Sequence, residues 1–78
     1  MNSEQMLDTV VLLFGRTADK LKVKYGTPDY LSFGGSYSMV RIPFWIRGTK
    51  YIYSKAYDPV ISPVDLRKEI ERALKNKM

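Results

Sequence analysis

The chain has 78 residues, of which 45% are hydrophobic and 27% are charged. So short a chain accommodates one folded domain and excludes a second, because it barely buries enough apolar surface to offset the entropy lost on folding. Its 13 Lys and Arg against 8 Asp and Glu leave a net charge of +5. Such a charge keeps a small protein soluble and also favours polyanionic partners, so we expect residues 1–78 to form a single basic domain.

Two residue types that build many functional sites are absent, since the sequence contains no Cys and no His. A disulfide framework and a thiolate zinc site are therefore excluded, and a reducing, intracellular compartment is permitted. The first 15 residues have no basic residue ahead of their apolar run, which Asp8 interrupts. This is neither the pattern of a signal peptide nor a bilayer span, so we expect a cytoplasmic protein that does not bind membranes.

The first predicted element is a helix that begins after Asn2, a candidate N-cap with Gln5 at the spacing of a capping box. Its end is predicted at Gly26, with Pro28 two residues beyond. The helix would carry one apolar face, because apolar side chains recur at steps of three and four residues. These are Leu7, Val10, Val11, Phe14, Ala18, Leu21 and Tyr25.

Two observations leave the end of this helix open. Gly15 lies in its middle, at a cost of about 1 kcal/mol relative to Ala, and residues 20–25 include an alternation typical of a strand. A helix ending near Phe14, or an extra strand in 20–25, is the alternative. Met6, Leu12 and Leu13 lie off the apolar face, which predicts that the helix is covered on a second side, by a homodimer contact.

Three strands are predicted next, at 29–33, 36–46 and 51–57. They are separated by a turn at Gly34-Gly35 and by a four-residue loop at 47–50, which together indicate an antiparallel meander. Pairing across the first turn sets Phe33 opposite Ser36 and Leu31 opposite Ser38. Pairing across the loop sets Ile46 opposite Tyr51 and Phe44 opposite Tyr53. Pro43 must then turn its nitrogen away from any partner strand.

Alternation along the second and third strands separates two faces. The core face carries the larger apolar side chains: Val40, Ile42, Phe44, Ile46, Tyr51, Tyr53 and Tyr57. The other face is basic, with one Trp in it: Arg41, Trp45, Arg47, Lys50 and Ile52. This face has no predicted cover.

The last predicted element is a helix with Ser62 as N-cap, Pro63 in its first position and Asp65 in its first turn. A narrow apolar stripe, with charged residues on both sides, predicts that it packs by one face only. The predicted fold is therefore α+β, with the order α-β-β-β-α and both helices on one face of a three-stranded sheet.

The sequence offers little for catalysis, because a Ser or Thr nucleophile needs a base to activate it and there is no His. The carboxylates of the sequence are not clustered as a magnesium site requires. A strand and not a helix is predicted after the glycines at 34–35, so these glycines do not indicate a phosphate-binding loop. We expect a non-enzymatic protein with no catalytic residue, cofactor or metal.

Two groups of basic residues stand out instead. Arg41, Arg47 and Lys50 share the outer sheet face with Trp45, a combination that both nucleic-acid and protein interfaces use. Arg16, Lys20 and Lys24 are four residues apart and would form one stripe on the first helix.

The order helix, three strands, helix is similar to that of the double-stranded RNA-binding domain. That family carries a lysine cluster at the start of its second helix, where this chain has "SPVDLRKE". Its RNA-contacting loop is not matched by "RGTK" either, so the resemblance is one of topology and no residue role is transferred.

The predicted function is a small nucleic-acid-binding or regulatory protein. In it, Arg41, Arg47 and Lys50 neutralise phosphates, Trp45 stacks, and the Arg16, Lys20 and Lys24 stripe extends the footprint. The alternative is a protein-interaction module, an adaptor or inhibitor that docks an acidic partner through the same sheet face, with or without a homodimer through the first helix.

Overall fold

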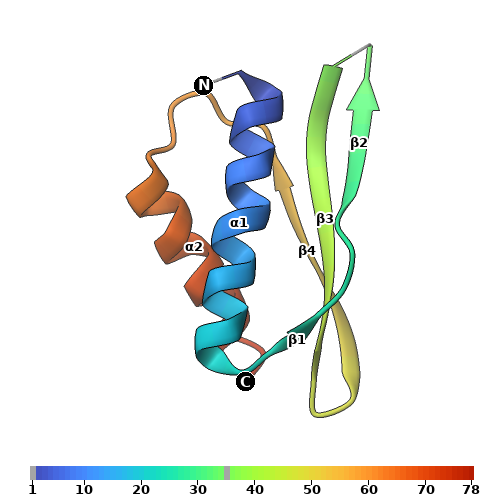
Figure 1. The fold of residues 1–78 in the computed structure, drawn as a ribbon, viewed down its shortest axis with the longest axis vertical. Coiled ribbons are helices and arrows are strands. Elements are labelled where there is room, and N and C mark those ends of the chain that lie inside the picture. Colours follow the sequence, from blue (N-terminus) through green and yellow to red (C-terminus); the bar gives the residue numbers. More distant parts are fainter. Residues whose placement is uncertain (1, 35) are drawn as a thin grey trace.

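In the computed structural model, which describes residues 2–34 and 36–78, two helices cover one face of an antiparallel sheet (Figure 1). The central strand β3 pairs with β1 and β2 along one side and with β4 along the other. This confirms the predicted α+β fold, to which the structure adds one short strand. The elements in chain order are α1 (Ser3–Leu21), β1 (Lys24–Tyr25), β2 (Asp29–Phe33), β3 (Ser36–Ile46), β4 (Thr49–Ala56) and α2 (Pro63–Lys75). Neither described helix combines the length and the apolar character that crossing a membrane requires.

Helix α1 begins as predicted and ends earlier than predicted. Asn2 Oδ1 accepts a hydrogen bond from the Gln5 amide at 2.8 Å, and Gln5 Oε1 accepts one from the Asn2 amide at 3.3 Å, which completes the capping box. The helix runs through Gly15 and stops at Leu21, where Lys22 takes a left-handed conformation with φ 59°. An end near Phe14 and an end at Gly26 were therefore both wrong.

Strand β1 occupies the last part of the ambiguous segment 20–25. Lys24 lies opposite Trp45 and Tyr25 opposite Phe44, so the alternation in "LKVKY" did indicate a strand, although only for two residues. Lys24 consequently lies on the sheet and not on the basic stripe of α1, where it was predicted.

The β3–β4 hairpin closes two residues earlier along β4 than predicted. Ile46 pairs with Thr49, Phe44 with Tyr51 and Ile42 with Tyr53, which leaves a two-residue turn. Both turn residues have positive φ, 53° at Arg47 and 79° at Gly48. Positive φ at both positions is the signature of a type I′ turn, whose twist matches that of paired strands. The predicted four-residue loop was wrong for this reason.

The β2–β3 pairing is correct at its start and shifts further on. Phe33 pairs with Ser36 as predicted, but a bulge between Leu31 and Ser32 places Leu31 opposite Met39 and not Ser38. Of the predicted Gly34-Gly35 turn, Gly35 lies outside the described residues.

Pro43 is accommodated because β1 and β2 leave a gap beside it. Its carbonyl accepts a hydrogen bond from the Gly26 amide at 2.9 Å, in the loop between β1 and β2. On β4, Pro43 lies opposite Ile52. This is the third residue pair after the pair that closes the hairpin, and in an antiparallel ladder that pair is not hydrogen-bonded. The missing N–H of Pro43 therefore costs no hydrogen bond to β4, as predicted.

The core lies between the predicted sheet face and the two helices. Val40, Ile42 and Phe44 are buried, as is Tyr53 across from Ile42, while Tyr57 at the sheet's end is exposed. At the centre of the core, Phe14 of α1 is fully buried. Its ring centroid lies 5.3–5.9 Å from those of three aromatic side chains: Tyr25, Phe44 and Tyr53.

Helix α2 packs mainly on α1 and joins β4 through polar contacts. Leu66, Ile70 and Leu74 form its buried side, and Glu69 forms an ion pair with Lys55 of β4 at 3.0 Å. This packing bears on the predicted dimer contact, because α2 covers a second side of α1 within one chain.

Within α1, Met6 is buried and Leu13 packs against the core, so both are covered inside one chain. Leu12 alone of the three remains exposed, at 54%. The apolar residues outside the main apolar face of α1 are therefore explained without a second copy of the chain.

Candidate functional site

The sheet face opposite the helices has no covering element among the described residues (Figure 1). Because side chains alternate along a strand, Arg41, Pro43 and Trp45 of β3 share this face. Ile52 of β4, opposite Pro43, is 52% exposed on it. The predicted outer face is thus present in the structure and open to a partner.

Trp45 lies between two lysines on this face. Its Cα partner is Lys24 on β1 and Lys50 on β4, so the three residues form one row across three strands. Directly opposite residues of an antiparallel pair have Cβ atoms about 4.5–5.5 Å apart. Trp45 is half-buried and both lysines are exposed. The row places one aromatic ring between two side chains that carry a positive charge.

Gly26 allows the loop after β1 to cover part of Trp45. An ideal Cβ at this glycine would lie 3.3 Å from Trp45 Cη2 and 3.1 Å from Pro43 Cγ, both tighter than ordinary contacts. The loop after β1 therefore passes close over one edge of the indole, and it does so because residue 26 has no side chain. From the sequence alone, this glycine is predicted only to end a helix.

A hollow of about 230 Å³ adjoins the same tryptophan. Lys22 and Arg47 contribute to its lining, and the remaining lining residues, Met78 among them, are apolar. Both cations occupy left-handed backbone positions, at the end of α1 and in the β3–β4 turn. We name Trp45 and the four cations around it the Trp45 cluster: Lys22, Lys24, Trp45, Arg47 and Lys50.

The cations of the Trp45 cluster keep their charge available. None of them takes part in the ion pairs within 4.0 Å that the structure describes. Arg41 differs, because its Nη2 lies 3.0 Å from Asp29 Oδ2. It is also four residues from Trp45, about 13 Å along an extended strand. Of the predicted sheet residues, Trp45, Arg47 and Lys50 are brought together, and Arg41 is set apart with its charge balanced.

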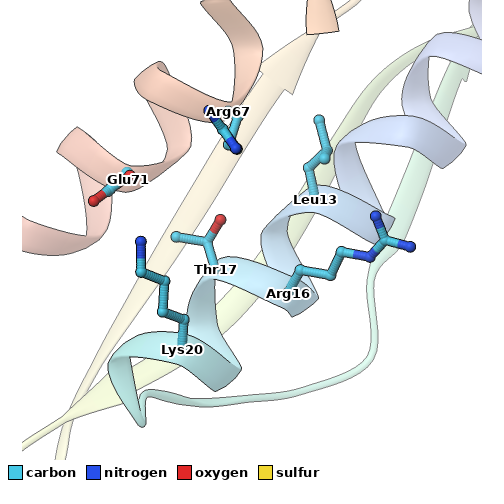
Figure 2. Close-up of a pocket in the computed structure, with 6 residues that line it drawn as sticks. All are labelled: Leu13, Arg16, Thr17, Lys20, Arg67 and Glu71. Carbon is cyan, nitrogen blue, oxygen red and sulfur yellow. The ribbon is translucent and has the colours of Figure 1, made fainter. Parts of the chain in front are cut away.

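The remaining predicted residues lie elsewhere. Arg16 and Lys20 are on α1 and line a groove between α1 and α2, in the helical layer rather than on the uncovered sheet face (Figure 2). Neither of them lines the hollow beside Trp45. Lys24 joins the Trp45 cluster by way of β1, and Lys22 was not predicted at all.

No residue in the part of the chain that the structure describes belongs to a group of three or more His, Cys, Asp or Glu suited to holding a metal. The chain matches no protein-family model, no curated protein and no solved structure. Its function is therefore inferred from the chemistry of the Trp45 cluster.

Proposed function

We propose that this protein is a non-catalytic binding module that holds a single-stranded segment of nucleic acid on the uncovered face of its sheet. The observation that carries the proposal is the row Lys24, Trp45, Lys50. An indole accepts a stacked base whatever its sequence, at about 1–3 kcal/mol per base. Ammonium groups on either side suit the phosphates that precede and follow that base.

The other two cations of the Trp45 cluster extend the same role. Lys22 and Arg47 border the hollow next to Trp45, where a second base or sugar would lie beside an apolar lining. Each phosphate neutralised on a single strand contributes roughly 0.7 to the slope of log affinity against log salt. Four cations acting together give a slope of roughly −3.

The test is fluorescence anisotropy of a labelled single-stranded oligonucleotide of about 12 nucleotides, within the usual site sizes of such binders. Affinity is measured from about 50 to 200 mM salt, where phosphate contacts are strongly salt-dependent. Lys50→Gln should lower the slope by roughly 0.7. Lys68→Gln is the matched control, because it removes one charge from an exposed position on α2. Equal effects of the two variants would contradict the proposed site.

A protein partner is the second candidate function, favoured by the middle of the same face. Exposed Ile52 lies opposite half-buried Pro43, and the Arg41 and Asp29 ion pair borders them with both signs of charge. An apolar centre with a polar rim is typical of protein interfaces. An acidic partner would meet the lysines beside Trp45.

One variant distinguishes nucleic-acid binding from protein binding. Ile52→Ser should abolish a protein contact centred on the apolar middle and leave oligonucleotide affinity unchanged. Sedimentation over a range of protein concentrations would show whether a second copy of the chain is such a partner.

A further inference from the structure

The helical layer contains a second hollow with its own chemistry, between α1 and α2 and not on the uncovered sheet face. A groove of about 340 Å³ lies between α1 and α2, and Figure 2 shows the side chains around it. The lining consists of Leu13, Arg16, Thr17, Lys20, Arg67 and Glu71. Three of these six residues are cations, and both helices contribute to them.

The cations of the groove have no close carboxylate partner. Neither Arg16, Lys20 nor Arg67 belongs to an ion pair within 4.0 Å in the described part of the chain. The carboxylate of the groove, Glu71, is held by Lys75 of its own helix at 2.8 Å. A positive excess therefore remains in the groove.

The cations of the groove also act on the carboxyl of Glu71. The pKa of its carboxyl lies below the ordinary value, first because of the hydrogen bond and charge of Lys75, and then because of Lys20 and Arg67. The carboxylate stays ionised at neutral pH, and its one charge does not balance the cations around it.

A hydroxyl lies at the floor of the groove. Thr17 is only 6% exposed, and Figure 2 shows its hydroxyl directed into the space between the helices, with Lys20 below it and Arg67 above. Thr is an uncommon choice for a buried helix position against a core, and a hydroxyl there offers a hydrogen-bond donor. Leu13 supplies an apolar wall next to it.

We propose that the groove between α1 and α2 binds the phosphoryl group of a small organic phosphate. An Arg guanidinium binds phosphate oxygens with two parallel hydrogen bonds, while a Lys ammonium acts as a point charge. Arg67 and Lys20 approach such a group from opposite helices, Arg16 adds charge at the rim, and the Thr17 hydroxyl donates from the floor. Leu13 contacts the organic part of the ligand.

This ligand would bridge α1 and α2, and the proposal does not depend on nucleic-acid binding by the sheet. A ligand that binds only the folded protein raises its stability in proportion to the logarithm of ligand concentration above the dissociation constant. Thermal stabilisation by a phosphate compound is therefore an independent readout.

The test uses the intact chain labelled with ¹⁵N, titrated with inorganic phosphate, with ADP and, for comparison, with sodium chloride at equal ionic strength. Saturable shifts of the amides of Thr17, Lys20 and Arg67 are expected for phosphate and ADP. Tighter binding of ADP than of inorganic phosphate, with a larger shift of the Leu13 amide, would assign the organic part to the Leu13 wall. Shifts spread evenly over all Lys and Arg, or equal shifts with chloride, would overturn the proposal.

Variants make the test specific. Arg67→Gln should weaken phosphate binding at least fivefold, whereas Lys68→Gln, which removes the same charge from the next residue of α2, should not. Thr17→Val should weaken binding while Thr17→Ser retains it, because only the serine keeps the hydroxyl. Equal loss in Arg67→Gln and Lys68→Gln would leave only a general charge effect and contradict the site.

Discussion

Replacing Gly15 by Ala tests the contact between α1 and β1. Gly15 lies inside α1, where glycine is less favourable than Ala by about 1 kcal/mol. An ideal Cβ at this position would lie 3.0 Å from the Tyr25 hydroxyl oxygen and 3.5 Å from Tyr25 Cζ. The new methyl group is therefore crowded by one oxygen atom at the end of a partly exposed side chain.

The magnitude follows from these two opposing effects. In a Tyr25→Phe background the crowding oxygen is gone, and Gly15→Ala should stabilise the protein by about 0.5–1 kcal/mol. With Tyr25 present, the hydroxyl must move by a few tenths of an ångström, and the gain should fall to between zero and about 0.5 kcal/mol. The two substitutions are thus coupled, with the double variant more stable than the sum of the single effects.

The assay is unfolding by urea and by heat, followed by circular dichroism, for the four members of this double-mutant cycle. In a domain of this size, 1 kcal/mol shifts Tm by about 4–8 °C, so the expected gain in the Tyr25→Phe background is measurable. Destabilisation by Gly15→Ala in both backgrounds would refute a helix that continues through residue 15. Equal stabilisation in both would refute the contact with Tyr25.

Three further predictions concern the turn, the core and the pH dependence. Gly48→Ala should destabilise the protein by about 1–2 kcal/mol in urea unfolding, because φ is 79° in the two-residue turn and left-handed backbone is costly for any residue with a Cβ; an unchanged midpoint would contradict that turn. Phe14→Ala should cost about 3–5 kcal/mol, since Phe14 is fully buried among three rings; a loss below about 1 kcal/mol would place Phe14 outside the core. Burial, and then the charge and hydrogen bond of Glu69, raise the pKa of the Tyr53 hydroxyl well above its ordinary value. The stability that depends on protonated Tyr53 is present below the unfolded pKa of about 10 and is lost as pH rises beyond it. Wild type should therefore lose more stability than Tyr53→Phe between pH 9 and 11, roughly the range that brackets this pKa, and parallel curves would contradict the burial of this hydroxyl.

Local signals in the sequence were sufficient for the architecture. The Asn2 capping box and the Ser62 cap with Pro63 are short-range patterns, and both helices begin where those patterns lie. Alternation along 40–46 also assigned the buried and exposed faces of β3 correctly, because burial on one face imposes a period of two.

Register was predicted less well, and the reason is geometric. Shifting β4 by two residues leaves every side chain on the same face, so alternation cannot distinguish the two-residue turn from the four-residue loop. Only the positive φ at Arg47 and Gly48 decides between them. Arg rarely adopts a positive φ, so the sequence does not indicate this turn. The bulge between Leu31 and Ser32 likewise cannot be predicted from the alternation of side chains in a strand of only five residues.

The candidate site depended on where α1 ends. Extending the helix by one turn put Lys24 on a stripe with Arg16 and Lys20, whereas the chain reverses at Lys22 and returns Lys24 to the row beside Trp45. A cation spacing of four residues fits a helix, but it carries no information about whether the helix continues.

We propose that Trp45 stacks on nucleic-acid bases between Lys24 and Lys50. Trp45 is the only tryptophan, so its emission reports on that site alone. The most direct measurement is a titration of its fluorescence with a single-stranded oligonucleotide at low and at moderate salt. Saturable quenching, with binding lost as salt rises, is the result predicted here. Emission that stays unchanged at low salt, in the presence of excess oligonucleotide, would contradict the claim and direct attention to a protein partner for this face.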